Sequence, residues 1–248
     1  MDSLFRFKHF SVRNPSGIGQ RVGTDGVLLG AAVQLQGTEA RILDIGTGTG
    51  VISLMIAQRL CDAGKTPQIT ALEIDEQAAR SAELNFSDSP WAGWLTCLHK
   101  SLEDYSLDQA WEGNPLRFDL IVSNPPFFDC SLPSPDSRRN AARHTDSLSY
   151  REILSFAHDF LSEDGRVALI LPKEEEARLR RTAATFGMKI TRLVSIHTTA
   201  AKPARRIIAK ISFACISCGP QRRESLTLDD GNGRRSAQYS SLTKDFYL

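Results

Sequence analysis

The chain has 248 residues, of which 41% are hydrophobic and 24% are charged, so it can bury the core of one large domain and is too apolar for wholesale disorder. The net charge of +1 argues neither for nor against a polyanionic partner. The charge is uneven, however: residues 1–172 hold 15 Lys and Arg against 22 Asp and Glu, and residues 173–248 hold 15 against 7, which predicts either a nucleic-acid-binding face or a set of solvated helix and strand edges.

Predicted strands and helices alternate along most of the chain. Strands are predicted at residues 41–45, 68–74, 95–98, 118–123 and 165–171, and helices at 51–60, 75–86, 149–161 and 174–186. Asp75 is placed to cap the second of these helices, and Ser149 with Glu152 has the pattern of a capping box at the start of the third. Such alternation predicts a mostly parallel sheet with helices on both faces.

Two β-rich segments complete the predicted sheet. Residues 189–197 and 206–217 follow each other without a clear helix between them, which predicts an antiparallel hairpin at one sheet edge. Residues 124–147 are rich in Pro and polar side chains and are predicted to form a loop, as is the stretch 229–237. We expect residues 1–248 to form a single domain.

A glycine-rich turn joins strand 41–45 to helix 51–60. Its alternate glycines, Gly46, Gly48 and Gly50, let the backbone turn sharply and approach a ligand closely, although a tight turn without a ligand is the plainer alternative. The spacing is G-x-G-x-G and not the dinucleotide pattern G-x-G-x-x-G. The preceding Asp44 would repel a pyrophosphate and attract a cationic amino group. The turn therefore favours S-adenosylmethionine over a nicotinamide cofactor.

Two acidic residues follow at the end of the next strand. Glu73 is placed where a carboxylate can accept both ribose hydroxyls of an adenosine, and a solvated carboxylate is the alternative. For Asp75 we favour the role of helix cap. Because ligands of open α/β sheets bind at the carboxyl ends of the strands, Asp44, Glu73 and Asn124 are expected to meet in one crevice.

Asn124-Pro125-Pro126-Phe127 directly follows strand 118–123. An exocyclic amine is a poor nucleophile because its lone pair is delocalised into the ring. If the amide oxygen of Asn124 and the carbonyl of Pro125 each accept one N–H, the lone pair can point at a methyl group. Pro126 stiffens the turn and Phe127 offers a face for a flipped base. A plain Pro-rich turn is the alternative. We assign no general base and no catalytic histidine, since alignment would dominate catalysis.

Three further segments carry a family resemblance: Phe7-Lys8-x-Phe10, residues 21–30 (RVGTDGVLLG) and the closing Leu242-Thr243-x-Asp245-Phe246-Tyr247-Leu248. With the two turns, they make the chain resemble the class I methyltransferases, and among them the bacterial tRNA1(Val) adenine-37 N6-methyltransferase family. The resemblance covers nearly the whole chain. It implies an α/β, Rossmann-like, mostly parallel sheet of seven strands with an antiparallel edge hairpin, and residues 1–33 packing over the site as an N-terminal extension.

The resemblance also implies roles for individual residues. The cofactor would be held by Thr24, Asp25 and Gly26 at its methionine end and by Asp44, Gly46, Thr47, Gly48, Gly50, Glu73, Ile74, Ser101 and Asn124 elsewhere. For Thr24, Asp25 and Gly26 a second reading is the N-terminal cap of a short helix 26–33. Asn124, Pro125, Pro126 and Phe127 would hold the base.

The expected partner is tRNA, with the target base extruded from a loop. Phosphate contacts are expected from Arg6, Lys8, Arg13, Arg21, Arg138, Arg139, Arg143, Lys202, Arg205 and Arg206. Cys215 and Cys218 form a lone C-x-x-C without a second ligand pair, so we expect no metal. The odd cysteine count predicts a reducing cytoplasm, and the lack of a long apolar run predicts a protein away from membranes. We also expect a monomer.

Several alternatives stay open. N-P-P-F also suits N2-guanine RNA methyltransferases, and the N-P-P turn suits protein glutamine N5-methyltransferases, although the latter usually carry an N-terminal helical domain. A nicotinamide dehydrogenase and a non-catalytic nucleic-acid-binding module are the rivals from other classes.

Overall fold

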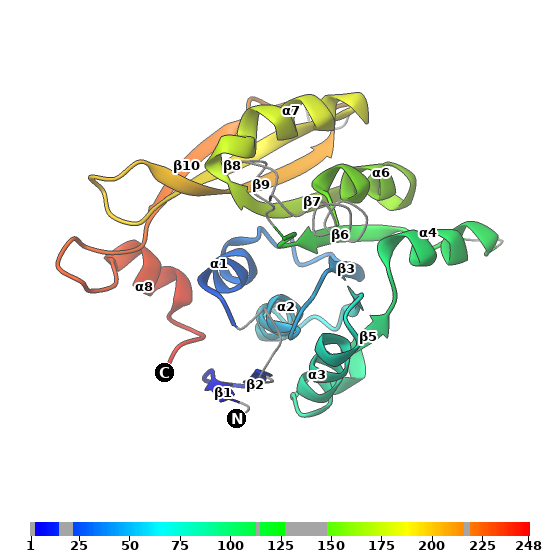
Figure 1. Cartoon of the computed structure of the whole chain (residues 1–248), viewed down its shortest axis with the longest axis horizontal. Coiled ribbons are helices and arrows are strands. Elements are labelled where there is room, and N and C mark those ends of the chain that lie inside the picture. The colour runs from blue at the N-terminus through cyan, green and yellow to red at the C-terminus, as the bar shows by residue number, and fades with distance from the viewer. Residues whose placement is uncertain (1–2, 15–21, 113–114, 127–147, 216–218) are drawn as a thin grey trace, which may run out of the picture.

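The computed structural model describes residues 3–14, 22–112, 115–126, 148–215 and 219–248. Within this part of the chain, an eight-stranded sheet runs in the order β10-β8-β9-β7-β6-β3-β4-β5 (Figure 1). Its strands are β3 (Arg41–Ile45), β4 (Gln68–Glu73), β5 (Leu95–His99), β6 (Phe118–Ser123), β7 (Leu161–Pro172), β8 (Met188–His197), β9 (Ala204–Phe213) and β10 (Arg222–Thr227). Neighbouring strands are parallel except where the pair includes β9. The carboxyl ends of the parallel strands therefore share one edge.

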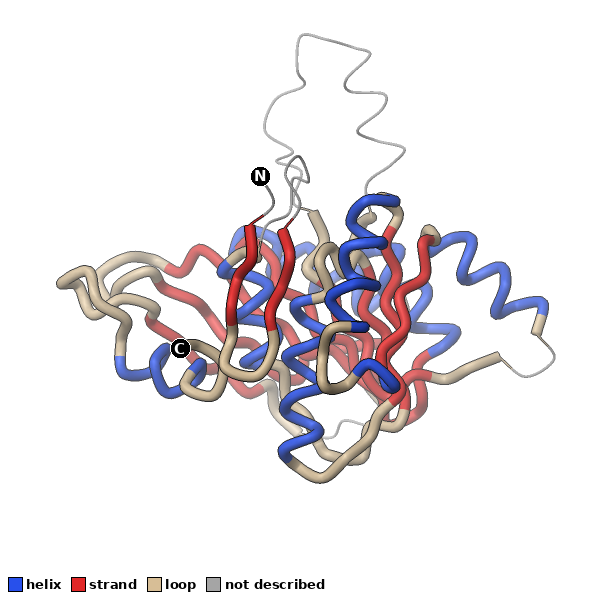
Figure 2. Tube along the Cα trace, turned by 90° about the horizontal axis from the view of Figure 1, so that it is seen from below, coloured by secondary structure: helices blue, strands red, loops and turns tan. Residues whose placement is uncertain are grey.

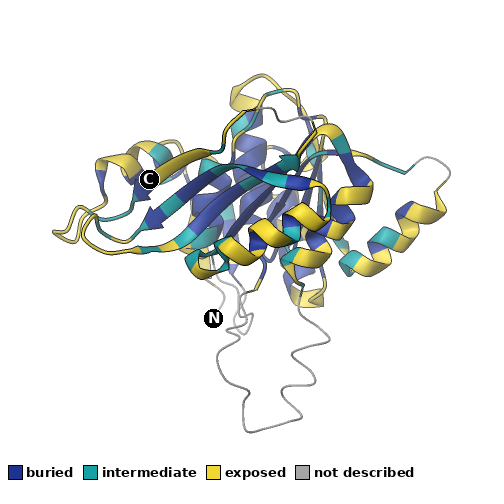
Figure 3. Cartoon of the chain, turned by 90° about the horizontal axis from the view of Figure 1, so that it is seen from above, coloured by how far each residue is buried: buried dark blue, intermediate teal, exposed yellow. Residues whose placement is uncertain are grey.

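Helices cover both faces of this sheet. They are α1 (Thr24–Ala32), α2 (Val51–Asp62), α3 (Glu76–Ser87), α4 (Leu102–Trp111), α6 (Tyr150–Phe160), α7 (Glu176–Thr185), α8 (Ala237–Thr243) and the short η1 (Ala92–Trp94) and η2 (Lys173–Glu175). One apolar cluster joins α1, α2, α3 and α8 to the sheet, and a second joins α4, α6 and α7 to the other face. Figure 3 shows the strands buried between helices whose outer sides are exposed. The alternation in the sequence therefore predicted the layers correctly.

Local signals at helix starts behave as their chemistry predicts in two places. The Asp75 side chain accepts a hydrogen bond from the Ala78 amide at 2.8 Å and caps α3. Ser149 and Glu152 form the predicted capping box of α6. The predicted cap at Thr24 or Asp25 is wrong, because α1 begins at Thr24 itself and the extended Gly23 precedes it without a side-chain hydrogen bond.

The predicted seven-stranded sheet with a terminal hairpin needs correction. β8 and β9 are antiparallel as expected, but β10 pairs in parallel with β8 on the outer side and makes an eighth strand. The expected second segment also lies earlier, at Ala204–Phe213. Residues 222–227 were missed because four of the six are exposed at the sheet edge, so no apolar run marks them.

The two ends of the chain pack together. The hairpin of β1 (Ser3–Arg6) and β2 (Ser11–Asn14) lies beside the C-terminal tail (Figure 2). The Lys8 amide donates to the Phe246 carbonyl at 2.8 Å, and the rings of Phe7 and Tyr247 stack at 6.0 Å. The Gln58 side chain on α2 donates to the Asp245 carbonyl at 3.0 Å. The two terminal motifs thus form one packed unit on the α1 and α2 face.

In the described ranges no helix combines the length and apolar character needed to cross a membrane.

Candidate functional site

The glycine turn after β3 has a backbone conformation that favours glycine. Gly46, Gly48 and Gly50 have φ angles of 69°, 59° and 83°, in the left-handed region that side chains disfavour. The amides of Gly46 and Thr47 both donate to the Leu72 carbonyl, at 2.9 and 3.0 Å. The turn is therefore held onto β4, the neighbouring strand, and leads directly into α2.

Asp44 lies at the bottom of this turn and is fully buried. Its Oδ2 accepts hydrogen bonds from the hydroxyls of Thr47 and Ser53, both at 2.7 Å, while its Oδ1 has no partner. Burial raises the pKa of Asp44 to about 6, and the two hydroxyl hydrogen bonds oppose that rise. A cationic group beside Oδ1 would satisfy the unpartnered atom and stabilise the charge.

Glu73 connects the turn to the end of β4. Its Oε2 accepts from the Gly48 amide at 2.8 Å and its Oε1 from the Asp75 amide at 3.0 Å. A carboxylate offers about four acceptor positions, so two remain for hydroxyl groups of a ligand. Next to it, Ile74 is 58% exposed and presents an apolar side chain at the strand end. These positions suit the ribose and the ring of an adenosine.

Asn124 stands at the end of β6, directly beside the glycine turn. β3 and β6 are paired with Ile45 opposite Ser123, and the Ser123 hydroxyl donates to the Ile45 carbonyl at 2.7 Å. Gly46 and Asn124 therefore leave neighbouring strands at the same edge, where strands lie about 4.8 Å apart. The Oδ1 of Asn124 is buried and has no partner. Pro125 is buried and Pro126 exposed, whereas Phe127 lies outside the described residues.

The start of α1 lies against the start of α2. A Cβ on Gly26 would come within 3.1 Å of Val51, which directly follows the glycine turn. The carboxylate of Asp25 accepts from Nε of Arg206 at 2.9 Å, so a predicted cofactor residue and a predicted RNA residue form an ion pair. Thr24 is exposed. Ser101, the expected adenine neighbour, caps α4 by accepting from the Asp104 amide at 3.0 Å.

The predicted RNA-contacting cations fall into separate groups. Arg6 is exposed on β1, the Lys8 ammonium donates to the Lys244 carbonyl, and Arg13 pairs with Asp88 at 2.6 Å. Lys202 is exposed between β8 and β9, and Arg205 is exposed at the start of β9, where the carboxyl ends of the parallel strands lie. The remaining predicted members, Arg21, Arg138, Arg139 and Arg143, lie outside the described residues.

Sequence reasoning missed two polar side chains that support the site. Ser53 is fully buried on α2 and holds Asp44, as given above. Asn85 on α3 donates to the Thr49 carbonyl at 2.9 Å and accepts from the Arg13 amide at 2.9 Å, so it joins the glycine turn to the N-terminal hairpin. A lone Ser in the otherwise apolar start of α2 was an available signal. The contacts of Asn85 depend on tertiary packing and left none.

Described residues hold no group of three or more His, Cys, Asp or Glu side chains arranged to bind a metal ion. Cys215 is a free, exposed thiol, and Cys218 lies outside the described part.

Comparisons with known proteins agree with this arrangement. The model of the methyltransferase small domain family matches residues 22–188. A protein of Bacteroides fragilis (strain YCH46) is 39% identical over 99% of this chain and 98% of its own length, and one of Pedobacter heparinus is 40% identical over 100% and 99%; both are named tRNA1(Val) (adenine(37)-N6)-methyltransferase.

Solved structures match in fold. A protein described as a predicted O-methyltransferase from Agrobacterium tumefaciens superposes with a TM-score of 0.60 at 16% identity, covering 89% of this chain and 96% of its own. The mitomycin 7-O-methyltransferase MmcR gives 0.51 at 15% identity, covering 77% and 53%. The sheet, the glycine turn and the Asn-Pro-Pro turn thus occur in a fold that methyltransferases use.

Proposed function

Because the chain belongs to the tRNA1(Val) (adenine(37)-N6)-methyltransferase family, we propose that it methylates the N6 amine of an adenine in tRNA, with adenine 37 of tRNA1(Val) as the expected target. The observation that carries the proposal is the buried, unpartnered Oδ1 of Asn124, one strand away from the buried, unpartnered Oδ1 of Asp44. The Asn124 oxygen can accept a hydrogen bond from a donor, and the Asp44 oxygen can bind a cation. An amine substrate and a cationic cofactor supply these two groups.

The residues present fit S-adenosylmethionine. Asp44 would hold its amino group, the Gly46–Gly50 turn would lie along its amino-acid part, and Glu73 would hold its ribose hydroxyls. Ile74 would contact the adenine ring, Ser101 would lie near it, and Thr24, Asp25 and Gly26 would border the methionine end. When bound, this cofactor supplies a methyl group already activated by a positively charged sulfur.

Asn124 and Pro125 would prepare the amine. An amide oxygen and a backbone carbonyl that each accept one N–H direct the nitrogen lone pair away from the ring plane. The positive charge that develops on the nitrogen strengthens both hydrogen bonds, so they stabilise the transition state more than the ground state. The nitrogen would lose its proton to water after the N–C bond forms and the bond between methyl and sulfur breaks, and no side-chain base is required. Phe127 is proposed to stack on the extruded base.

The substrate would reach the site from the edge where the parallel strands end. Arg6 on the N-terminal hairpin, Lys202 before β9 and Arg205 at the start of β9 are exposed cations suited to phosphate groups. The pairing of Asp25 with Arg206 joins the cofactor side of the site to this edge. Residues 1–33 would form one wall of the site, which the hydrogen bonds of Asn85 to the turn and to the hairpin support.

Nucleoside analysis tests this proposal. Purified protein is incubated with labelled S-adenosylmethionine and either unmodified tRNA1(Val) or bulk protein, and the products are hydrolysed and separated. We expect label in N6-methyladenosine, and none when guanine replaces adenine 37. Label in N2-methylguanosine, or in a glutamine side chain, would replace the proposed substrate by one of the two rivals.

A further inference from the structure

A row of three cations crosses β10, β8 and β9, the three outermost strands at one side of the sheet, away from the site just described. Arg222 on β10 is in register with Arg192 on β8, and Arg192 is in register with Lys210 on β9. Residues in register share a face, here the one covered by α1 and α8, since Val194 and Leu226 further along the same strands belong to the apolar cluster on that face. Like charges directly opposite each other destabilise a sheet, so this row needs an explanation.

Two cations in this region have a structural role at the end of α1. Arg192 donates to Ala32 at the end of α1 and Arg59 to the carbonyls of Gly30 and Val33, at 2.8–3.0 Å, so both cations stabilise the negative end of that helix. Glu224 pairs with Arg192 through both carboxylate oxygens, at 2.9 and 2.8 Å.

Arg222 remains outside this arrangement. Across the described ranges its guanidinium makes no hydrogen bond and no ion pair, and the nearby Glu224 pairs with Arg192. Among the described residues, the ammonium of Lys210 also has only a neutral partner, the Gln34 side chain at 3.1 Å. The pKa of Lys210 is lowered, first by burial and then by the charges of Arg166, Arg192 and Arg222. Positive charge is therefore in excess here.

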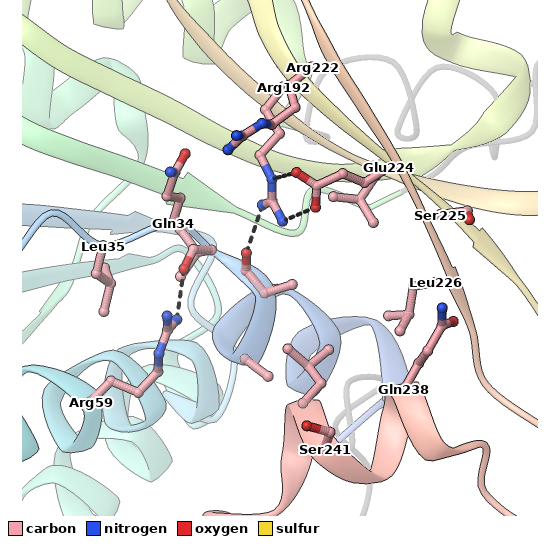
Figure 4. A pocket seen from close by; sticks show the side chains of 15 residues that line it. Gln34, Leu35, Arg59, Arg192, Arg222, Glu224, Ser225, Leu226, Gln238 and Ser241 are labelled. Atoms are coloured by element: carbon pink, nitrogen blue, oxygen red, sulfur yellow. Dashed lines mark hydrogen bonds and ion pairs between the residues drawn. The ribbon is translucent and has the colours of Figure 1, made fainter.

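This excess charge borders an open pocket of about 570 Å³. Figure 4 shows Arg192, Arg222 and Glu224 on one side and Gln238 and Ser241 on the other. Glu224 is the one carboxylate among the described lining residues. Gln238 uses its oxygen to accept from the Thr227 amide at 2.9 Å, which leaves its NH2 group to donate. Apolar wall is supplied by Val33, Val194, Leu226 and Leu242. The volume suits a ligand larger than a single inorganic ion.

We propose that this pocket binds a nucleotide, with its phosphate on Arg222 and its sugar or base against the apolar wall. The nucleotide belongs either to the RNA chain or to a free mononucleotide pool, and both share the same chemistry. The RNA source rests on the proposed function. It is compatible with the geometry because Asp25 and the pocket lie at opposite ends of α1, whose nine residues span about 13 Å. An RNA substrate bound at the strand edge can extend over that distance.

Arg222→Gln tests the proposal, and Arg223→Gln is its matched control. Arg223 is the next residue and loses the same charge, but it faces the opposite side of the sheet and pairs with Glu176 at 2.9 Å. Two probes are titrated into wild-type protein and both variants: AMP, with adenosine as the phosphate-free comparison, and unmodified tRNA across a series of KCl concentrations.

We expect Arg222→Gln to weaken binding of at least one probe about tenfold, and Arg223→Gln to bind like wild type. If RNA is the source, the slope of log affinity against log salt also falls by about one. If the free nucleotide is the source, only AMP binding changes. The melting temperature should not fall, because the substitution removes a positive charge that lies opposite the positive charge of Arg192 on the neighbouring strand.

Unchanged binding of both probes by Arg222→Gln, or an equal loss with Arg223→Gln, would overturn the proposal. These measurements require no methyl transfer. A protein that fails to methylate tRNA but binds it through Arg222 would contradict the proposed function and would still support nucleotide binding in this pocket.

Discussion

At the scale of single residues, two buried oxygens define the site. Leaving a buried polar atom without a partner costs about 1–3 kcal/mol, so such atoms are uncommon in folded proteins. Four occur among the described side chains, and two of them, Asp44 Oδ1 and Asn124 Oδ1, belong to residues at the carboxyl ends of the neighbouring strands β3 and β6. Their proximity is what a site would need if its ligands supply the missing partners.

The raised pKa of Asp44 predicts a pH dependence of cofactor binding. Between a pH of 3.8 and a pH of about 6, the folded protein holds a proton on Asp44 that the unfolded chain has lost. This group therefore favours folding more as the pH falls through that window. Binding of a cationic amino group requires the ionised form. We therefore expect calorimetry to show S-adenosylmethionine affinity constant above a pH of about 6 and falling about tenfold per unit below it.

Asp44→Asn is the control for this prediction. The variant should bind the cofactor more weakly at neutral pH and show no change between pH values of about 4.5 and 7. A parallel loss of affinity in wild type and variant would assign the titration to another group.

At the scale of elements, the glycine turn depends on its neighbours. Gly50 has a φ of 83°, and a Cβ there would come within 2.4 Å of the Phe86 ring on α3. Gly64 has a similar φ of 72° but open space around it. Both positions share the backbone strain of a left-handed residue, and Gly50 adds a steric overlap with a buried ring.

Substituting the two glycines separates strain from overlap. We expect Gly64→Ala to lower the free energy of unfolding by about 1 kcal/mol, from backbone strain alone. Gly50→Ala should lower it by about 3 kcal/mol, since Phe86 must also move. Urea unfolding of both variants measures the difference, and equal losses would show that the Phe86 contact has no energetic role.

Elements with a local signal could be predicted from the sequence, and those defined by their neighbours could not. The turns after β3 and β6 carry their own Gly and Pro residues, and the caps Asp75 and Ser149 act within three residues. β10 is held by pairing with β8 and shows no apolar run, so the eighth strand was missed. The cap of α1 was misassigned because Gly23 provides an extended backbone without any side chain.

At the scale of the whole molecule, segments far apart in sequence support one another. The C-terminal tail accepts hydrogen bonds from Lys8 and Gln58, and Phe246 is 2% exposed between the N-terminal hairpin and α2. Burying a Phe side chain contributes about 2 kcal/mol. Through Asn85 the same hairpin reaches the glycine turn. The tail should therefore stabilise one wall of the site without forming part of it.

Removing residues 245–248 tests this coupling. We expect a lower melting temperature and faster amide exchange in residues 3–14, while strands β3, β6 and β7 keep their protection because their pairing is untouched. Deletion of Leu248 alone is the control, since it is 85% exposed. Unchanged exchange in the hairpin after the longer deletion would refute the coupling.

In the proposed mechanism Asn124 acts mainly on the amine, and its expected contact with the cofactor adds little to cofactor affinity. Asn124→Ala protein is compared with wild type in two assays, calorimetric titration with S-adenosylmethionine and the rate of N6-methyladenosine formation in tRNA1(Val). We predict an unchanged dissociation constant together with a loss of methyl transfer of about a hundredfold or more. Retained transfer, or an equal loss of binding and transfer, would contradict the account.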